Sequence, residues 1–273
     1  MRIITDTHGE LNNPPLVYTV LMVRFPTQTS LEERIPEVQD ALKQVYPIYE
    51  KRVQQGIEII RSDDNQTVRT IDTPEFMFFD SARTKGVILK SDRIIFHSSV
   101  YPNFEEFSAW FKDVAGAVIS ILSISHYLSC GIRYIDAVVP DIASGESLED
   151  YLQSSLLNFD ICDNGIKKCL SSSQANVYES DIGVVRFNSY ISFNEGVCVP
   201  PDLKDIAGLL RFEIVKSVAP FAILDFDHGY GAPDGTADEL DLDKLVVQID
   251  EMHTVASNAF LSAITENALG RWK

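Results

Sequence analysis

The chain has few cysteines and histidines for its 273 residues, and neither type follows a metal-binding or catalytic spacing. Its four cysteines (Cys130, Cys162, Cys169, Cys198) form no Cys-x-x-Cys pair, so we expect free thiols in a reducing compartment. The five histidines are scattered, without a His-Glu-x-x-His motif. A nucleophile elbow, a phosphate loop and a dinucleotide fingerprint are also absent. We therefore predict no metal, no cofactor and no catalytic residue.

Positive charge and long apolar segments are also scarce. The chain carries 23 Lys and Arg against 40 Asp and Glu, for a formal net charge of −17. Such a field repels phosphate backbones and anionic lipids, so we expect neither nucleic acid nor a membrane as partner, and a basic protein instead. The chain opens without an apolar leader, and its longest apolar run, 114–124, is too short to span a bilayer. We therefore expect a cytoplasmic protein.

Hydrophobic periodicity predicts an α+β fold. Apolar residues at helical spacing predict two long helices, and runs of apolar residues between polar turns predict strands. The polar segment 160–176, which contains Ser171-Ser172-Ser173, is expected to be a loop. The expected strands are 16–25, 57–61, 75–80, 86–90, 93–100, 127–139, 177–178, 183–193, 209–217 and 221–226, and the expected helices are 30–45, 104–121, 147–157 and 242–269.

The same order of elements occurs twice along the chain. Each half contains a strand, a helix, several strands and a long helix. We interpret residues 1–127 and 128–273 as two degenerate α+β repeats that share a core and can be counted as one domain. Two such units can join their strands in one antiparallel sheet, covered on one face by long helices.

The most distinctive pattern is an arginine between an aliphatic and an aromatic residue, found in four predicted strands. Side chains alternate along a strand, so the apolar pair is expected to face the core and the arginine the opposite side. A third of the twelve arginines follow this pattern, which predicts a shared arginine-bearing face. The triplets are Val23-Arg24-Phe25, Ile132-Arg133-Tyr134, Val185-Arg186-Phe187 and Leu210-Arg211-Phe212.

This arginine-bearing face has two interpretations. The planar guanidinium suits carboxylates and phosphates, so Arg24, Arg133, Arg186 and Arg211 are candidate binding residues for an anionic ligand. Arginine also tolerates the solvent side of a strand, where it pairs with acids such as Glu213. The sequence leaves both interpretations open.

Acidic residues between positions 225 and 243 raise the question of a metal site. Asp225 and Asp227 share one side of a predicted strand, and hard cations prefer clustered oxygens. The spacing of a calcium loop is incomplete, however, because Tyr230 and Thr236 stand where acids are needed. We therefore favour roles in a turn and at a helix amino end.

Six short segments carry a resemblance to a known group of proteins. The central one, Gly131-Ile132-Arg133-Tyr134-Ile135-Asp136, is similar to the Gly-Leu-Arg-Tyr-Ile-Asn motif of a sporadically distributed, uncharacterised bacterial family of about this length. The segments 13–16, 23–26, 46–47, 101–107 and 259–265 also resemble that family. Here isoleucine replaces leucine, aspartate replaces asparagine at 136, and Asn103-Phe104 stands in place of Gly-Trp.

The resemblance implies no activity, cofactor or catalytic residue, and its members' place among variable accessory genes favours a defence or toxin-related role. The leading hypothesis is a non-catalytic acidic interaction protein that engages another, basic, protein, in a toxin-neutralising or defence-associated system. The alternative is a binding domain or enzyme for an anionic, nucleotide-like small molecule held on the arginine-bearing face, with Tyr134 and His97 nearby. The oligomeric state is not determined by the sequence.

Overall fold

The computed structural model describes residues 11–62, 65–157, 168–194, 196–197, 200–210, 216–217 and 220–273. The strands are β1 (Leu16–Arg24), β2 (Ile48–Ser62), β3 (Asn65–Phe79), β4 (Lys85–Lys90), β5 (Arg93–Ser98), β6 (His126–Tyr127), β7 (Ser129–Val138), β8 (Ser171–Ser180), β9 (Gly183–Ser192), β10 (Gly196–Val197), β11 (Lys216–Ser217), β12 (Phe221–Gly231) and β13 (Asp238–Glu239). The α-helices are α1 (Leu31–Leu42), α2 (Phe104–Leu122), α3 (Lys204–Ala207), α4 (Leu242–Ala263) and α5 (Glu266–Trp272). The 3₁₀ turns are η1 (Ile142–Ser144), η2 (Leu148–Asp150), η3 (Ser154–Leu156) and η4 (Pro201–Leu203).

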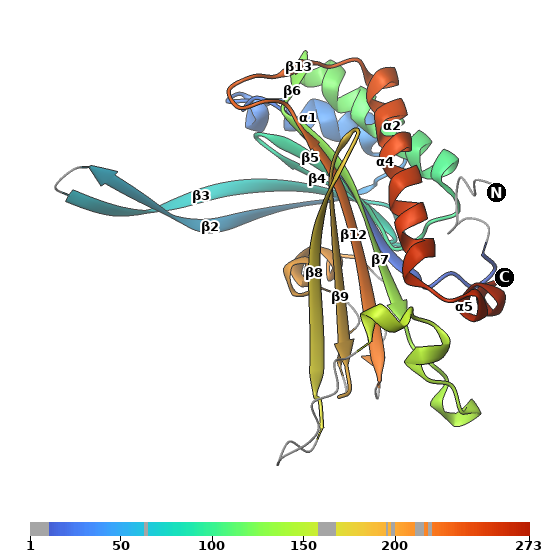
Figure 1. Cartoon of the computed structure of the whole chain (residues 1–273). Helices are drawn as coiled ribbons and strands as arrows, with labels where there is room; N and C mark the ends of the chain where they lie inside the picture. Colours follow the sequence, from blue (N-terminus) through green and yellow to red (C-terminus); the bar gives the residue numbers. More distant parts are fainter. Residues whose placement is uncertain are drawn as a thin grey trace.

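The protein is an α+β structure built on one antiparallel sheet of nine strands, as the periodicity predicts at that level (Figure 1). The strand order is β2-β3-β4-β5-β1-β7-β12-β9-β8. Among the strands of this sheet, the first strand of each half (β1, β7) lies at the centre, the last one (β5, β12) pairs with it, and the earlier ones follow outwards. The two central strands, β1 and β7, pair with each other over Arg24↔Ser129 to Leu16↔Asp136.

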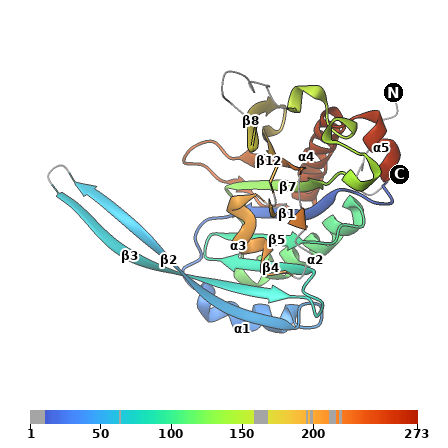
Figure 2. The ribbon, with the colours of Figure 1, turned by 90° about the horizontal axis from the view of Figure 1, so that it is seen from below.

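The main core lies between the sheet and the helices α1, α2 and α4, which pack on one of its faces (Figure 2). Asn103 caps the amino end of helix α2. Its side chain accepts a hydrogen bond from the Glu106 N–H at 2.8 Å, an amide that has no carbonyl acceptor within the helix. Its apolar stripe is buried against the strands, for example Phe107 against Phe96, with ring centroids 5.2 Å apart. The same cluster includes residues of both halves of the chain, so the two halves share one core.

A second, smaller apolar cluster lies on the opposite face of the sheet. The segment formed by η4 and α3 contributes Leu203 and Ala207, which belong to the same cluster as Tyr18 of β1 and Ile95 of β5. Only part of this face is covered by that segment (Figure 2). We call this side of the sheet the arginine face, because Arg133 and Arg186 project from it.

The β2–β3 hairpin is much longer than the sequence predicts. Its ladder runs without a shift from Ile48↔Phe79 to Ser62↔Asn65. Strand β3 pairs with β4 only over Phe76–Phe79, so the outer part of the hairpin projects from the body (Figure 1). Alternation of apolar residues is weak there, which explains why periodicity missed most of both strands.

Two further sequence predictions are wrong. The helix expected at 147–157 is replaced by the 3₁₀ turns η2 and η3, because the backbone between them pairs with another segment: Leu152 forms a bridge with Ile264, and the Gln153 N–H donates to the Ala263 carbonyl at 2.9 Å. The loop expected at 160–176 contains part of β8, whose polar residues pair with β9 from Ser171↔Ser192 to Ser180↔Gly183. Residues 158–167 lie outside the described part of the chain.

The strand expected at 209–217 is found only as β11, since Gly208, Leu209 and Leu210 form a turn after α3 and 211–215 lie outside the described residues. The long last helix ends at Ala263, and Thr265 caps the separate helix α5. Among the described residues, no helix is long and apolar enough to span a membrane. Cys130 and Cys169 are free thiols.

Candidate functional site

Three of the four predicted arginines lie on one face of the sheet. Arg24, Arg133 and Arg186 come from β1, β7 and β9. Their apolar neighbours are buried on the other face: Val23, Phe25, Ile132, Tyr134 and Phe187 belong to the helix-covered core, and Val185 lines a depression beside residues of α4. The alternation predicted from the sequence is thus confirmed for these three triplets. Arg211 lies outside the described residues.

Arg133 and Arg186 are close neighbours, whereas Arg24 is apart from them. Asp227 of β12 is directly opposite Arg133 on one side and Arg186 on the other. Arg24 is four residues along β1 from Val20, the residue opposite Arg133, which corresponds to about 13 Å. It pairs instead with Asp92 at 3.4 Å and is half exposed. The candidate site therefore consists of Arg133 and Arg186 with their acidic neighbours.

The guanidinium of Arg133 is held by two carboxylates. Its Nε and Nη2 donate to the two oxygens of Asp225, each at 2.7 Å, and Nη1 donates to Asp202 at 2.7 Å. The side chain of Asp225 is 0% exposed, whereas that of Asp202, on η4, is 60% exposed. Asn188 of β9 donates a further hydrogen bond to Asp225 at 3.2 Å. Arg133 thus joins β7, β12 and the η4–α3 segment.

The electrostatics follow from this geometry. Burial opposes the charged form of Arg133, but its hydrogen bonds to Asp225 and Asp202 raise the pKa of the guanidinium above its usual value. Burial acts to raise the pKa of Asp202, and the hydrogen bond from Arg133 outweighs it, so that pKa is lowered. Burial raises the pKa of Asp227, even though both arginines oppose this. Two guanidinium groups therefore face three carboxylates.

Arg186 is the more available of the two cations. Its side chain is 53% exposed, and its Nη1 lies 3.7 Å from Asp227. A shallow depression of about 430 Å³ is lined by Arg133, Arg186, Tyr190 and Asp202, among others. A polar solute can reach Arg186 there without displacing a short ion pair.

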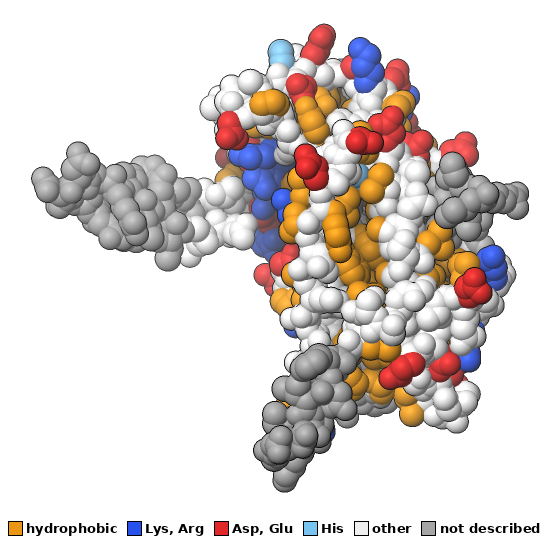
Figure 3. Space-filling view, in the orientation of Figure 1, with side chains coloured by type: hydrophobic (Ala, Val, Ile, Leu, Met, Phe, Trp, Pro, Cys, Tyr) orange, Lys and Arg blue, Asp and Glu red, His pale blue; other side chains and the backbone are white. Residues whose placement is uncertain are grey.

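A second depression, of about 320 Å³, continues along the sheet towards β5 and β4. Its floor is apolar, with Val20, Met22 and Ile95, and its rim includes Lys90 and Arg93. Lys90 pairs with Glu75, and Arg93 donates to Asp92 at 2.7 Å. Figure 3 shows Lys and Arg side chains gathered where the β2–β3 hairpin leaves the body. These cations are matched by acids of the same face.

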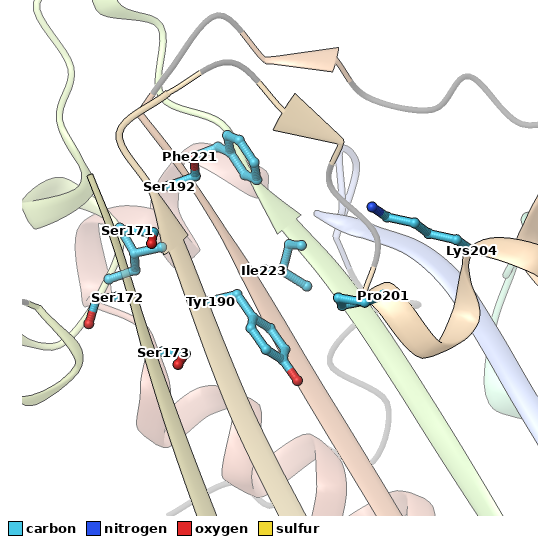
Figure 4. A pocket seen from close by; sticks show the side chains of 10 residues that line it. Ser171, Ser172, Ser173, Tyr190, Ser192, Pro201, Lys204, Phe221 and Ile223 are labelled. Carbon is cyan, nitrogen blue, oxygen red and sulfur yellow. The ribbon is translucent and has the colours of Figure 1, made fainter. Parts of the chain in front are cut away.

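A third depression, of about 290 Å³, lies at the β8 edge of this face (Figure 4). Tyr190 and Ile223 lie between the serines of β8 and Pro201 of η4, and Lys204 is on the far side. Its lining is mainly hydroxyl and apolar.

Neither of the two residues predicted to accompany the arginines reaches them. Tyr134 points into the opposite core, where its hydroxyl lies 2.8 Å from His253 Nδ1. His97 is fully buried on the arginine face and contacts the Tyr18 hydroxyl at 2.6 Å through Nδ1. Burial lowers the pKa of His97 to about 3, so its ring is neutral at physiological pH.

The sequence did not identify the acidic partners of Arg133. The acidic run that contains Asp225 raises the question of a metal site, and the structure shows this carboxylate paired with Arg133. Among the described residues, no three His, Cys, Asp or Glu side chains are arranged to hold a metal ion. An acid at alternate positions of a strand, as at Asp225 and Asp227, is a signal that could have suggested a cross-strand arginine partner. Glu213, the expected partner, lies outside the described residues.

One serine–histidine contact lies away from this face. Ser180, at the β8–β9 turn, is 2.9 Å from His228 Nε2, and His228 Nδ1 is 3.1 Å from the Met252 carbonyl of α4. The Ser180 hydroxyl also lies 3.1 Å from the Gly183 carbonyl. His228 is fully buried, and none of the depressions described above includes the pair. This contact ties the turn to the helix layer.

Comparison of the chain with protein-family models, with curated proteins and with solved structures finds no match.

Proposed function

We propose that this protein is a non-catalytic interaction protein that engages another protein, and that the β2–β3 hairpin is the arm with which it does so. The supporting observation is the outer part of that hairpin. From Val53↔Pro74 to Ser62↔Asn65 its two strands pair only with each other among the described residues. These ten pairs extend roughly 33 Å from the sheet (Figure 2).

An isolated two-stranded hairpin is marginally stable in water, because it buries little apolar surface. A partner that packs against the arm supplies the burial that the body does not. Val53, at the base of the arm, is already half exposed. An arm of this kind therefore makes sense as a structure that is completed by binding.

The charge of the chain indicates the kind of partner. A net charge of −17 attracts a basic protein and accelerates its approach at low salt. A toxin-neutralising or defence-associated setting, in which the partner is a basic enzyme such as a nuclease, is the form of this function that we propose.

The alternative, an anionic ligand on the arginine face, has less geometric support. Arg133 already donates to two carboxylates, and a ligand there would have to displace Asp202. Arg186 is the one member of the pair with half of its side chain exposed. If this alternative holds, a nucleoside triphosphate raises the melting temperature of the chain but not that of Arg186→Ala.

The arm can be removed without disturbing the body. Gln54 and Thr73 face each other across the ladder, so replacing residues 55–72 with Asn-Gly closes a short hairpin. We expect this arm-shortened chain to fold, because the removed residues pair only with each other. Arg186→Ala is the matched control, since it alters an exposed residue of the arginine face.

The experiment is co-purification from the native host with the full chain, the arm-shortened chain and Arg186→Ala, at low and high salt. The proposal predicts a basic protein that is retained by the full chain and by Arg186→Ala, is lost from the arm-shortened chain, and is released by salt. Retention by the arm-shortened chain, or the absence of any retained protein, contradicts it.

We also propose that the fold arose by internal duplication, with 1–127 and 128–273 as the repeats. The mirrored strand order around β1 and β7 supports this. Matching Arg24 with Arg133 relates each residue to the one 109 positions later, which equates Met22 with Gly131. Those two residues face each other in the β1–β7 ladder, where a two-fold axis between repeats would pass.

A further inference from the structure

The two outer strands of the sheet are protected differently. At the β2 edge, the part of the strand that lies on the body carries Glu50, Lys51 and Arg52, charged side chains that discourage pairing with another chain. Strand β8, at the other edge, has ten residues without lysine, arginine or proline, and its only charge is Glu179. Its ladder with β9 has no bulge. Strand β8 thus lacks the usual protection of an edge.

The exposed side chains of β8 have a graded order of size. Its first three residues are serines, and its large residues Val177 and Tyr178 come near the end. These two side chains are 68% and 54% exposed, among the most exposed large apolar residues described. The surface over β8 and β9 in Figure 3 is mostly white and orange. Strand β8 therefore presents apolar side chains with little charge, and among the described residues its ladder is with β9 alone.

From these features we infer that a second copy of the chain pairs with β8, antiparallel, about a two-fold axis at Ala175. Such an axis is perpendicular to the sheet, so both copies keep their helices on the same side. In an antiparallel pair, the side chains of directly opposite residues project to the same side of the sheet. The axis must therefore pass midway between the two copies of one residue, here Ala175. The result is one continuous sheet across two copies.

This register matches small side chains with large ones. Ser173 of one copy faces Val177 of the other, and Ser172 faces Tyr178, while Ser171 faces Glu179. No like charges are opposite each other, and the serine hydroxyl can donate to the carboxylate. A foreign strand has no such built-in complementarity with β8, which is why the second copy is the favoured occupant.

The pairing also satisfies the backbone. On an edge strand, alternate residues point their N–H and C=O groups outwards, and the proposed register joins them in roughly eight to ten hydrogen bonds. On the arginine face, Val177 of the second copy would lie beside Ser173, at the outer rim of the depression in Figure 4. The two arms, at the β2 edges, lie at the far ends of the joined sheet and remain available for other contacts.

The first test is the mass of the full chain in solution by sedimentation equilibrium. We expect twice the 30.6 kDa of one chain. Ala175→Glu places two like charges opposite each other and should weaken the dimer roughly fivefold or more, and mixing it with Ala175→Lys should restore the dimer. A mass of one chain at all concentrations, or a dimer that Ala175→Glu leaves unchanged, overturns the proposal and leaves β8 to another partner or to none.

Cysteine cross-linking tests the register. Two Ala175→Cys residues on the axis would have Cα atoms about 5 Å apart, within disulfide range, whereas two Val177→Cys residues would be about 14 Å apart. Under mild oxidation, and relative to the unmodified chain, we expect a cross-linked dimer for the first variant only. Equal cross-linking of both, or of neither, overturns the register.

This inference goes beyond the proposed function and does not depend on it. The arm-shortened chain retains β8, so it is expected to remain a dimer even where it loses its partner. The two proposals can therefore fail separately.

Discussion

Replacing Arg133 with methionine is expected to destabilise the protein strongly, because it leaves a buried carboxylate without its cation. Asp225 is fully buried and, of the hydrogen bonds within the described part of the chain, would keep the one from Asn188, at 3.2 Å. Breaking a buried ion pair by removing one partner costs about 3–5 kcal/mol of unfolding free energy. Methionine keeps most of the apolar stem of the side chain, so the loss can be assigned to the charge.

Two comparison variants separate this pair from the rest of the network. Asp202→Asn removes the ion pair between Arg133 and a carboxylate that is 60% exposed. This change should lower the free energy of unfolding by about 1 kcal/mol or less. The double variant Arg133→Met/Asp225→Leu removes both buried charges and should recover most of the loss. Urea unfolding, followed by the fluorescence of Trp110 and Trp272, measures all of these free energies.

For Arg133→Met, a loss below about 1 kcal/mol at pH 7, or a double variant as unstable as the single one, would refute the buried-pair reasoning.

Two other predictions concern the buried histidine of the arginine face. Gly86→Ala should destabilise the protein by about 2 kcal/mol or more in urea unfolding, because the new Cβ would lie 2.4 Å from His97 Nε2; Gly270→Ala, which meets nothing within 4 Å, should cost nothing. Burial lowers the pKa of His97 to about 3 in the folded state, so between about pH 6.5 and pH 3 its ring binds a proton only when the chain unfolds. The free energy of unfolding should therefore fall as pH decreases across that range. In that range the free energy of unfolding of His97→Gln should fall by about 1.4 kcal/mol per pH unit less than that of the parent chain. Equal slopes of unfolding free energy against pH for the two chains would contradict this role of His97.

Much of the fold was predictable because strands and helices have fixed periods. The apolar neighbours of Arg24, Arg133 and Arg186 had to face one way and the arginines the other, since alternation is a property of each strand by itself. The stripe from Phe104 to Val118 likewise predicted α2 nearly to its ends. These features need no knowledge of what lies across the sheet.

The errors occurred where local pattern is weak. The first part of β8, which begins with three serines, lies in a segment that the sequence predicts as a loop, because its hydrogen bonds come from β9 and not from its own periodicity. In the outer part of the β2–β3 hairpin, the sequence predicts only 57–61 as a strand, for the same reason. A polar segment can become a strand whenever a neighbouring strand offers a ladder.

The sequence by itself thus determined an acidic α+β chain with arginines on one side of its strands. Only the tertiary structure decided that Arg133 meets Asp225 and Asp202, which lie 92 and 69 residues away in the chain. It also decided which strands became the two edges. Alternation acts over neighbouring residues, whereas strand order and register depend on contacts between distant segments, and no local pattern encodes those contacts.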